Sequence, residues 1–206
     1  MNYYIDFDNT LYNTPLLTEK MLTTLSTYVS EKKAIDYNSI YKSCQLMFNY
    51  DNIYNIYELT RYLCNKHSLE PLPIISNINE IILQGENFVF EDSISFLKNL
   101  KLAGHNIYLL SYAKNNLQYQ IAKITGSKLA HFFDALYITS KEKYKLDINY
   151  TNGIFIDDNP SDLSGLYSKN PIKVIRLRRE NNKHSLENLK NENIKEYSNF
   201  LEVPID

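Results

Sequence analysis

The sequence predicts an α/β fold in which helices cover both faces of a mostly parallel sheet, with a helical segment inserted after the first strand. Three observations support this fold class: short apolar runs rich in β-branched and aromatic residues recur, helical patterns separate them, and one long stretch is helical in spacing throughout. With 206 residues and 44% hydrophobic content, the chain can bury one core and a small appended subdomain.

Five apolar runs are expected to form the strands of the sheet. They are residues 3–6, 107–111, 135–139, 153–157 and 172–177. Because helical patterns alternate with these runs, the strands are expected to lie parallel, and ligands then bind beyond their carboxyl ends.

Two helices between these strands are predicted from apolar residues that share one face and precede a glycine. The residues are Ile94, Leu97 and Leu100 before Gly104, and Leu117, Ile121 and Ile124 before Gly126. We expect Asp92 or Ser93 to cap the first of these helices.

The stretch between the first and second strands is too long for a simple crossover. It holds several apolar runs at helical spacing, with Pro71 and Pro73 as breaks. The sequence therefore predicts a core formed by residues 1–13 and 90–206, and a helical subdomain formed by residues 14–89.

The charge balance excludes some classes of partner. Lys and Arg total 22 against 24 Asp and Glu, a net charge of −2, so neither nucleic acid nor a membrane is an expected partner. No run is long enough to span a bilayer, and a cytoplasmic location is expected.

Cys44 and Cys64 have no metal-ligand or disulfide spacing, which favours reduced, packed thiols. The basic stretch 176–184 is interpreted as a solvated exit from an edge strand.

Polar residues collect where the predicted strands end. The first strand is followed by Asp6 and Asp8, and later strands by Ser111, by Lys141 and Lys143, and by Asp157 and Asp158. Each has an ordinary structural explanation by itself, such as a cap or a turn. Together they predict a ligand site, because the carboxyl ends of parallel strands meet at one rim.

This set of groups suits phosphoryl transfer. Asp6 and Asp158 can lie close together only if a cation neutralises them, and an all-oxygen site with few protein ligands suits Mg²⁺. One carboxylate can attack phosphorus, and a second one two residues on can protonate the leaving oxygen and then activate water. A hydroxyl, backbone amides and a lysine can bind the phosphoryl oxygens.

Four segments resemble, in order, the motifs of the haloacid dehalogenase (HAD) superfamily. They are "DFDNT" (6–10), "YLLS" (108–111), a lysine in "SKEK" (140–143) and "IDDNPSD" (156–162). The resemblance implies a Rossmann-like three-layer core with an inserted helical cap, as in the capped phosphatases of this superfamily.

The resemblance also implies a role for each matching residue. Asp6 would be the nucleophile and a metal ligand, and Asp8 the general acid and base, with its backbone carbonyl on Mg²⁺. The phosphate-binding residues would be Thr10, Ser111, Tyr112 and a lysine, for which Lys143 fits the spacing better than Lys141. Asp158 would bind the metal, and Asp157 and Asp162 would bind through water or orient the ligands.

Asp8 favours one reaction within the superfamily. Members that resemble dehalogenases lack an acid here, because a halide leaves without a proton, whereas an alkoxide from a phosphate ester needs one. The insertion corresponds to a cap suited to small substrates; Tyr50, Tyr54 and Tyr57 within it could contact substrate, although packing is the favoured interpretation.

The predicted function is that of a Mg²⁺-dependent phosphatase that hydrolyses a small phosphorylated metabolite through an aspartyl-phosphate. The alternatives are a phosphomutase, which returns the phosphoryl group to the substrate, and a non-catalytic phospholigand-binding module. The substrate and the oligomeric state stay open.

Overall fold

The computed structural model describes residues 1–49, 55–113, 116–148, 150, 153–169, 172–180, 182, 184–189, 191 and 193–205. The chain forms two compact units: Met1–Pro15 with Gly85–Asp206, here the core unit, and Leu16–Gln84, here the helical unit. Among the described residues, no helix combines the length and the apolar character that a membrane span requires.

The core unit contains a six-stranded sheet in the order β3-β2-β1-β4-β5-β6, with every pair of neighbouring strands parallel. The strands are β1 (Asn2–Ile5), β2 (Asn106–Tyr112), β3 (Ala135–Thr139), β4 (Gly153–Asp157), β5 (Lys173–Leu177) and β6 (Lys195–Tyr197). The predicted fold class is confirmed, and the first five strands lie within one residue of their expected bounds. The sequence analysis missed β6, a three-residue strand without an apolar run.

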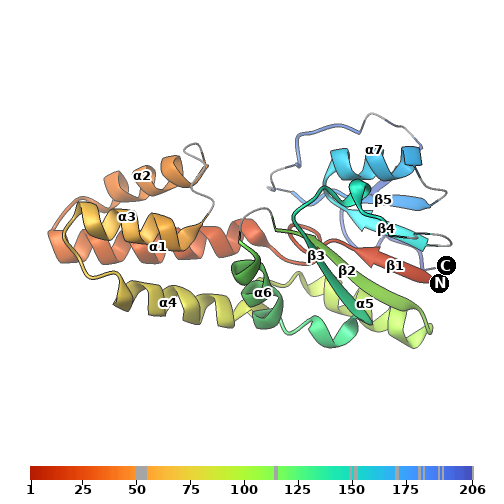
Figure 1. Ribbon diagram of the computed structural model, residues 1–206, viewed down its shortest axis with the longest axis horizontal. Helices are drawn as coiled ribbons and strands as arrows, with labels where there is room; N and C mark the ends of the chain where they lie inside the picture. The colour runs from red at the N-terminus through yellow and green to blue at the C-terminus, as the bar shows by residue number, and fades with distance from the viewer. Residues whose placement is uncertain are drawn as a thin grey trace. The chain divides into compact units, whose positions relative to one another are not determined.

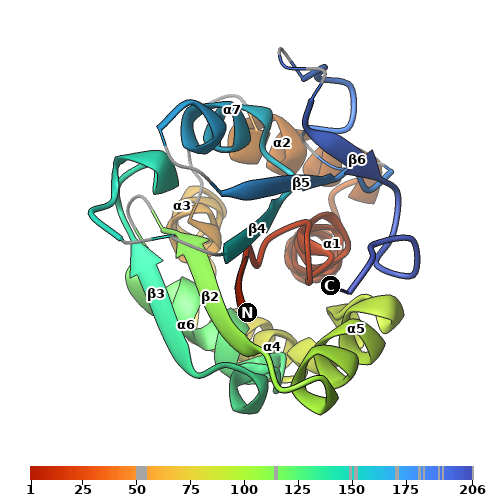
Figure 2. The same ribbon diagram turned by 90° about the vertical axis from the view of Figure 1, so that its right-hand side faces the viewer.

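Helices cover both faces of this sheet. The helical elements of the core unit are η1 (Gly85–Phe88), α5 (Glu91–Leu102), α6 (Leu117–Gly126), η2 (Ala130–Phe132), η3 (Lys143–Lys145) and α7 (Pro160–Lys169), where η marks a short 3₁₀ helix. Figure 2 shows α5 and α7 on opposite sides of the strands. Side chains on β1 alternate accordingly: Tyr3 meets Phe96 of α5 edge to face, and Tyr4 packs in the cluster that includes Leu163 and Leu166 of α7.

The start of α5 differs from the prediction. Its N-terminal cap is Phe90, which makes no side-chain capping bond, so neither Asp92 nor Ser93 is the cap. Asp92 instead receives two hydrogen bonds of 2.8 Å from the Arg179 guanidinium and one of 2.7 Å from the Phe200 backbone N–H. A carboxylate that could cap a helix is used here to bind the C-terminal part of the chain.

The helix α6 buries a different face from the one predicted, and Ile124 is common to both faces. Leu117 and Ile121 are 52% and 46% exposed, whereas Gln120 and Lys123 are only 4% and 3% exposed. Of the three predicted apolar contacts, only Ile124 is buried. The apolar periodicity of this helix was misleading, because its polar residues face inward to bind other polar groups.

The basic stretch after β5 is not a solvated exit from an edge strand. Strand β6 pairs with β5, and Arg176 and Arg179 are buried. Arg176 donates to the Glu196 carboxylate and to three backbone carbonyl groups, and Arg179 donates to the Thr10 carbonyl at 3.1 Å as well as to Asp92. These arginines are buried because each has its hydrogen-bonding capacity used by fixed acceptors.

The described residues of the helical unit form the helices α1 to α4, in keeping with the helical spacing of the sequence (Figure 1). They are α1 (Thr14–Lys33), α2 (Tyr37–Asn49), α3 (Ile56–Lys66) and α4 (Leu72–Leu83). Cys44 and Cys64 are free and buried within it, as expected of packed thiols. Tyr50 and Tyr54 lie outside the described residues, and the Tyr57 hydroxyl donates to the Asn79 side chain at 2.6 Å.

Gly165 of α7 makes room for the turn η3. A Cβ atom at this position would lie 2.5 Å from Cγ of Tyr144 and 2.9 Å from its Cβ, and the Cβ cannot move without the backbone. The change Gly165→Ala should lower the free energy of unfolding by about 1 kcal/mol, since an overpacking cost of about 1–3 kcal/mol exceeds a helix-propensity gain of about 1 kcal/mol. Urea unfolding measures this change. The control Ser168→Ala, on the exposed side of α7, should leave stability within about 0.5 kcal/mol, and unchanged stability of Gly165→Ala would contradict the packing argument.

Candidate active site

Asp6 stands directly after β1, at the rim where the parallel strands end. Its backbone N–H donates to the Ile156 carbonyl of β4 at 2.9 Å, which fixes the chain between the two central strands. The side chain is buried, and its Oδ1 accepts a hydrogen bond from Nζ of Lys143. The first predicted catalytic carboxylate is therefore paired with one of the two candidate lysines.

Lys143 bridges two carboxylates from different strands. Its Nζ donates to Oδ2 of Asp157 at 2.6 Å as well as to Asp6, and its backbone N–H donates to Oδ1 of Asp162 at 3.0 Å. Burial acts to lower the pKa of Lys143, but Asp157 and Asp6 outweigh it and hold that pKa above its ordinary value. The side chain is thus an ammonium group, and Asp162 positions the turn that carries it.

Three carboxylates converge beside this ammonium. Oxygen atoms of Asp6, Asp157 and Asp158 lie within 4.8 Å of one another, and all three side chains are buried. Burial, followed by the charge of Asp157, raises the pKa of Asp158 to about 9; burial also raises the pKa of Asp6, to about 8, against the opposing charge of Lys143. Three acids share one lysine in a buried site, and the raised pKa values of Asp6 and Asp158 mean that all three can ionise at neutral pH only beside a further positive charge.

This cluster fits a hard divalent cation. Its donors are all carboxylate oxygens, which Mg²⁺ and Ca²⁺ prefer, and Oδ2 of Asp158 is buried without a hydrogen-bond partner among the described residues. A buried acceptor without a donor is costly unless something else binds it. Asp6, Asp157 and Asp158 are therefore the residues that would hold the ion.

Asp8 has different hydrogen-bond partners from the three acids of the cluster. Its carboxylate accepts hydrogen bonds from the Lys123 ammonium, from Thr14 Oγ1 at 2.5 Å and from Gln120 Nε2 at 2.6 Å. Burial acts to raise the pKa of Asp8, but the Lys123 charge and these hydrogen bonds together lower it below its ordinary value. The side chain is part-buried, with 25% of its surface exposed.

The predicted phosphate-binding residues are placed differently from one another. Ser111 is buried at the end of β2, and its Oγ accepts from Gln120 Nε2 at 2.7 Å. Thr10 is buried, and its Oγ1 has no hydrogen-bond partner among the described residues. Tyr112 is 39% exposed, and the next backbone amide, that of Ala113, already donates to the Thr139 carbonyl at 2.7 Å. Thr10 and Ser111 therefore carry buried hydroxyl groups, whereas Tyr112 is exposed.

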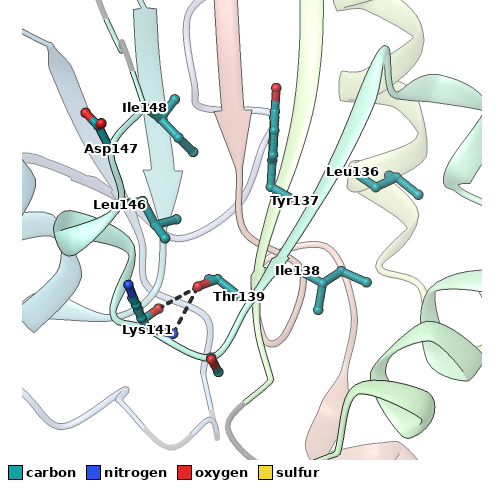
Figure 3. A pocket seen from close by; sticks show the side chains of 9 residues that line it. Leu136, Tyr137, Ile138, Thr139, Lys141, Leu146, Asp147 and Ile148 are labelled. Carbon is teal, nitrogen blue, oxygen red and sulfur yellow. Dashed lines mark hydrogen bonds between the residues drawn. The ribbon is translucent and has the colours of Figure 1, made fainter.

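Lys141 is exposed and lines a separate pocket (Figure 3). This pocket has a volume of about 530 Å³ and is formed by β3, the loop after it and residues 146–148. The Lys141 backbone N–H and carbonyl both bond with Oγ1 of Thr139, at 2.9 and 3.2 Å, which fixes the loop. None of the acidic residues of the site lines this pocket, so of the two candidate lysines it is Lys143 that the fold brings to Asp6.

Sequence reasoning missed the residues that surround Asp8. Gln120 and Lys123 were not singled out, because the apolar residues of α6 predicted a different face as buried. One signal was present: the two residues are three positions apart, which places them on the same side of a helix that follows the second motif.

Several solved structures share this fold at low sequence identity. The HAD phosphatase from Thermococcus onnurineus matches with a TM-score of 0.61 and 15% identity over 98% of this chain and 94% of that one. The putative HAD-hydrolase YfnB from Bacillus subtilis, bound to magnesium, matches with a TM-score of 0.57 and 12% identity over 98% and 95%. The 2-haloacid dehalogenase from Pseudomonas syringae pv. Tomato DC3000 matches with a TM-score of 0.56 and 13% identity over 97% and 94%.

No family model and no curated protein sequence matches the chain. The structural likeness extends over nearly the whole length of both chains, and it includes the unit inserted after the first motif as well as the parallel sheet. The resemblance that the four motifs indicated is confirmed at the level of the fold. The chain has the fold of the haloacid dehalogenase superfamily.

Proposed function

We propose that the protein is a divalent-cation-dependent phosphatase, with Mg²⁺ as the ion, that hydrolyses a small phosphate monoester through an aspartyl-phosphate on Asp6. One observation carries this proposal above the others. Two carboxylates two residues apart at one strand end have different surroundings: Asp6 lies with Asp157, Asp158 and a lysine, and Asp8 lies among hydrogen-bond donors. Distinct surroundings allow two carboxylates to take distinct chemical roles.

In the proposed reaction, a carboxylate oxygen of Asp6 attacks phosphorus and the bond to the leaving oxygen breaks. Asp8, which takes up a proton when the negatively charged ester binds beside it, gives that proton to the leaving oxygen as the alcohol departs. Asp8 then takes a proton from a water molecule, which attacks phosphorus, releases inorganic phosphate and restores Asp6. Lys143 and the hydroxyl groups of Ser111 and Thr10 would bind the oxygens that gain charge.

The metal ion has a specific place in this proposal. When bound to Asp6, Asp157 and Asp158, the ion supplies positive charge that offsets repulsion between the carboxylates and the phosphoryl group. The carboxylates of Asp6, Asp157 and Asp158 would hold it, and the Lys143 ammonium limits how much negative charge remains for it.

Phosphate esters are favoured over haloacids because of Asp8. A halide leaves as a stable anion, whereas an alkoxide needs a proton, and only the second reaction uses an acid at position 8. The contacts of Asp8 with three donors hold it in place beside the nucleophile, which a dehalogenase reaction would not require.

The direct test is phosphate release from a panel of phosphorylated sugars, nucleotides and cofactors, each with MgCl₂ and with EDTA. We expect release that depends on Mg²⁺ and falls by at least about 100-fold after chelation, because charge stabilisation by a metal contributes several kcal/mol to such reactions. Halide release from 2-chloropropionate, measured in parallel, is expected to be absent. Halide release without phosphate release from any ester would overturn the proposal, and so would phosphate release that EDTA leaves unchanged.

A further inference from the structure

We propose that Gln120 and Lys123 of α6 are positioning residues that hold the acid–base carboxylate of Asp8 and join it to the phosphate-binding hydroxyl of Ser111. This inference rests on the proposed phosphatase function and deepens it. It assigns a role in the reaction to a helix that contributes none of the four motifs.

The Lys123 side chain is buried against Asp8 and does not extend to the surface. Its side chain is 4% exposed, its ammonium contacts Oδ1 of Asp8, and it lies 5.8 Å from the ring of Phe7 and 5.1 Å from the ring of Tyr119. A lysine is almost never buried to this degree unless its charge is paired. The aromatic rings exclude water from one side of the ammonium, which leaves it a single strong partner and so a fixed position.

Gln120 connects two functional groups through one atom. Its Nε2 donates to Oδ2 of Asp8 at 2.6 Å and to Oγ of Ser111 at 2.7 Å. Because Ser111 Oγ accepts this bond, its own proton stays available for another acceptor, such as a phosphoryl oxygen. The amide therefore sets the direction of the hydroxyl at the same time as it fixes the second oxygen of Asp8.

The orientation of α6 supports a functional reason for this pair. The helix buries Gln120 and Lys123 while Leu117 and Ile121 are about half exposed, the reverse of what burial of apolar surface favours. Sites where a local rule is broken in this way are often functional ones. Lys123 and Gln120 are turned to the rim where Asp8 and Ser111 lie, and Thr14 completes the set of donors on Asp8.

The first test compares Lys123→Met, Lys123→Arg and the surface control Lys101→Met in turnover of an alkyl phosphate and of p-nitrophenyl phosphate. Lys101 also pairs with an aspartate, Asp134, but at the opposite end of β2. We expect Lys123→Met to lower kcat/KM for the alkyl ester by about 100-fold and for the aryl ester by less than about tenfold, because only the poor leaving group needs a well-aimed proton. Lys123→Arg should recover part of the loss, and Lys101→Met should behave as wild type.

Gln120→Leu gives an independent readout that needs no turnover. Calorimetric titration with inorganic phosphate in the presence of MgCl₂ should show about tenfold weaker binding for Gln120→Leu than for wild type, since the Ser111 hydroxyl loses its orientation. The control Gln118→Leu, at an exposed position two residues earlier, should bind phosphate as wild type does. Thermal unfolding of each variant identifies any that fail to fold.

The outcomes separate the inference from the proposed function. An active wild type in which Lys123→Met slows both esters equally, or in which Gln120→Leu binds phosphate normally, would overturn the positioning roles and leave the phosphatase standing. A wild type that cleaves no ester would count against the phosphatase. In that case weaker phosphate binding by Gln120→Leu would still support the link between Gln120 and Ser111, and equal binding would overturn it.

Discussion

Asp6→Asn should abolish phosphate release, lowering kcat by about 10⁴-fold or more, because the amide oxygen is a poor nucleophile and no other residue can replace the attacking group. The fold should survive the change. Asp6 is one of three buried carboxylates beside one ammonium, so removing its charge relieves repulsion at the same time as it weakens the bond from Lys143. Steady-state assays with the best ester, with thermal unfolding of the same preparation, measure both effects.

The matched control is Asp134→Asn. This aspartate pairs with Lys101 and accepts from the backbone N–H of Ile107, at the amino end of β2 and away from the rim. We expect full activity with a small loss of stability, of about 0.5–1 kcal/mol, because the ion pair is exposed. Phosphate release by Asp6→Asn within tenfold of wild type would show that Asp6 is not the nucleophile.

Lys143→Met should have the largest effect on stability. It leaves Asp6 and Asp157 buried without the ammonium that both contact, and breaking a buried ion pair from one side costs about 3–5 kcal/mol. Guanidinium unfolding in EDTA measures this loss. Adding MgCl₂ should restore more stability to Lys143→Met than it gives wild type, because the variant site has more uncompensated negative charge and a ligand stabilises the state that binds it. Phosphate turnover should also be lost.

The control for this variant is Lys141→Met, two residues earlier in the same loop. Its side chain is exposed beside the pocket of Figure 3, and only its backbone bonds with Thr139. Stability within about 0.5 kcal/mol of wild type and near-normal activity are expected. Equal losses from the two substitutions would contradict the assignment of Lys143 to the site.

The sequence predicts the sheet and its acidic rim well, for a physical reason. Buried parallel strands need continuous apolar runs, and the chain has five of them, each bounded by polar residues. The rim residues Asp6, Asp157 and Asp158 could be placed because they follow these runs directly, and strands that lie parallel bring such positions together.

The sequence is less informative where side-chain partners override apolar periodicity. Leu117 and Ile121 suggest a buried face that Gln120 and Lys123 occupy instead, since their bonds to Asp8 and Ser111 offset the burial of polar groups. The sequence predicts that Arg179 is a solvated cation. In the structure its side chain is buried, because its guanidinium donates hydrogen bonds to Asp92 and to the Thr10 carbonyl. Apart from Ser111, which is 9 positions from Gln120, these partners lie 87 to 169 positions away along the chain, at separations that local patterns do not record.

The central claim is that Asp6 carries the phosphoryl group during the reaction. The most direct measurement is acid quenching of the enzyme during turnover of p-nitrophenyl phosphate with MgCl₂, followed by peptide mass spectrometry. We predict an acid-stable, hydroxylamine-sensitive phosphoryl group on the peptide that contains Asp6, reduced in amount when EDTA replaces MgCl₂. Steady turnover with no phosphoryl group on Asp6, or with the group on another residue, would contradict the account.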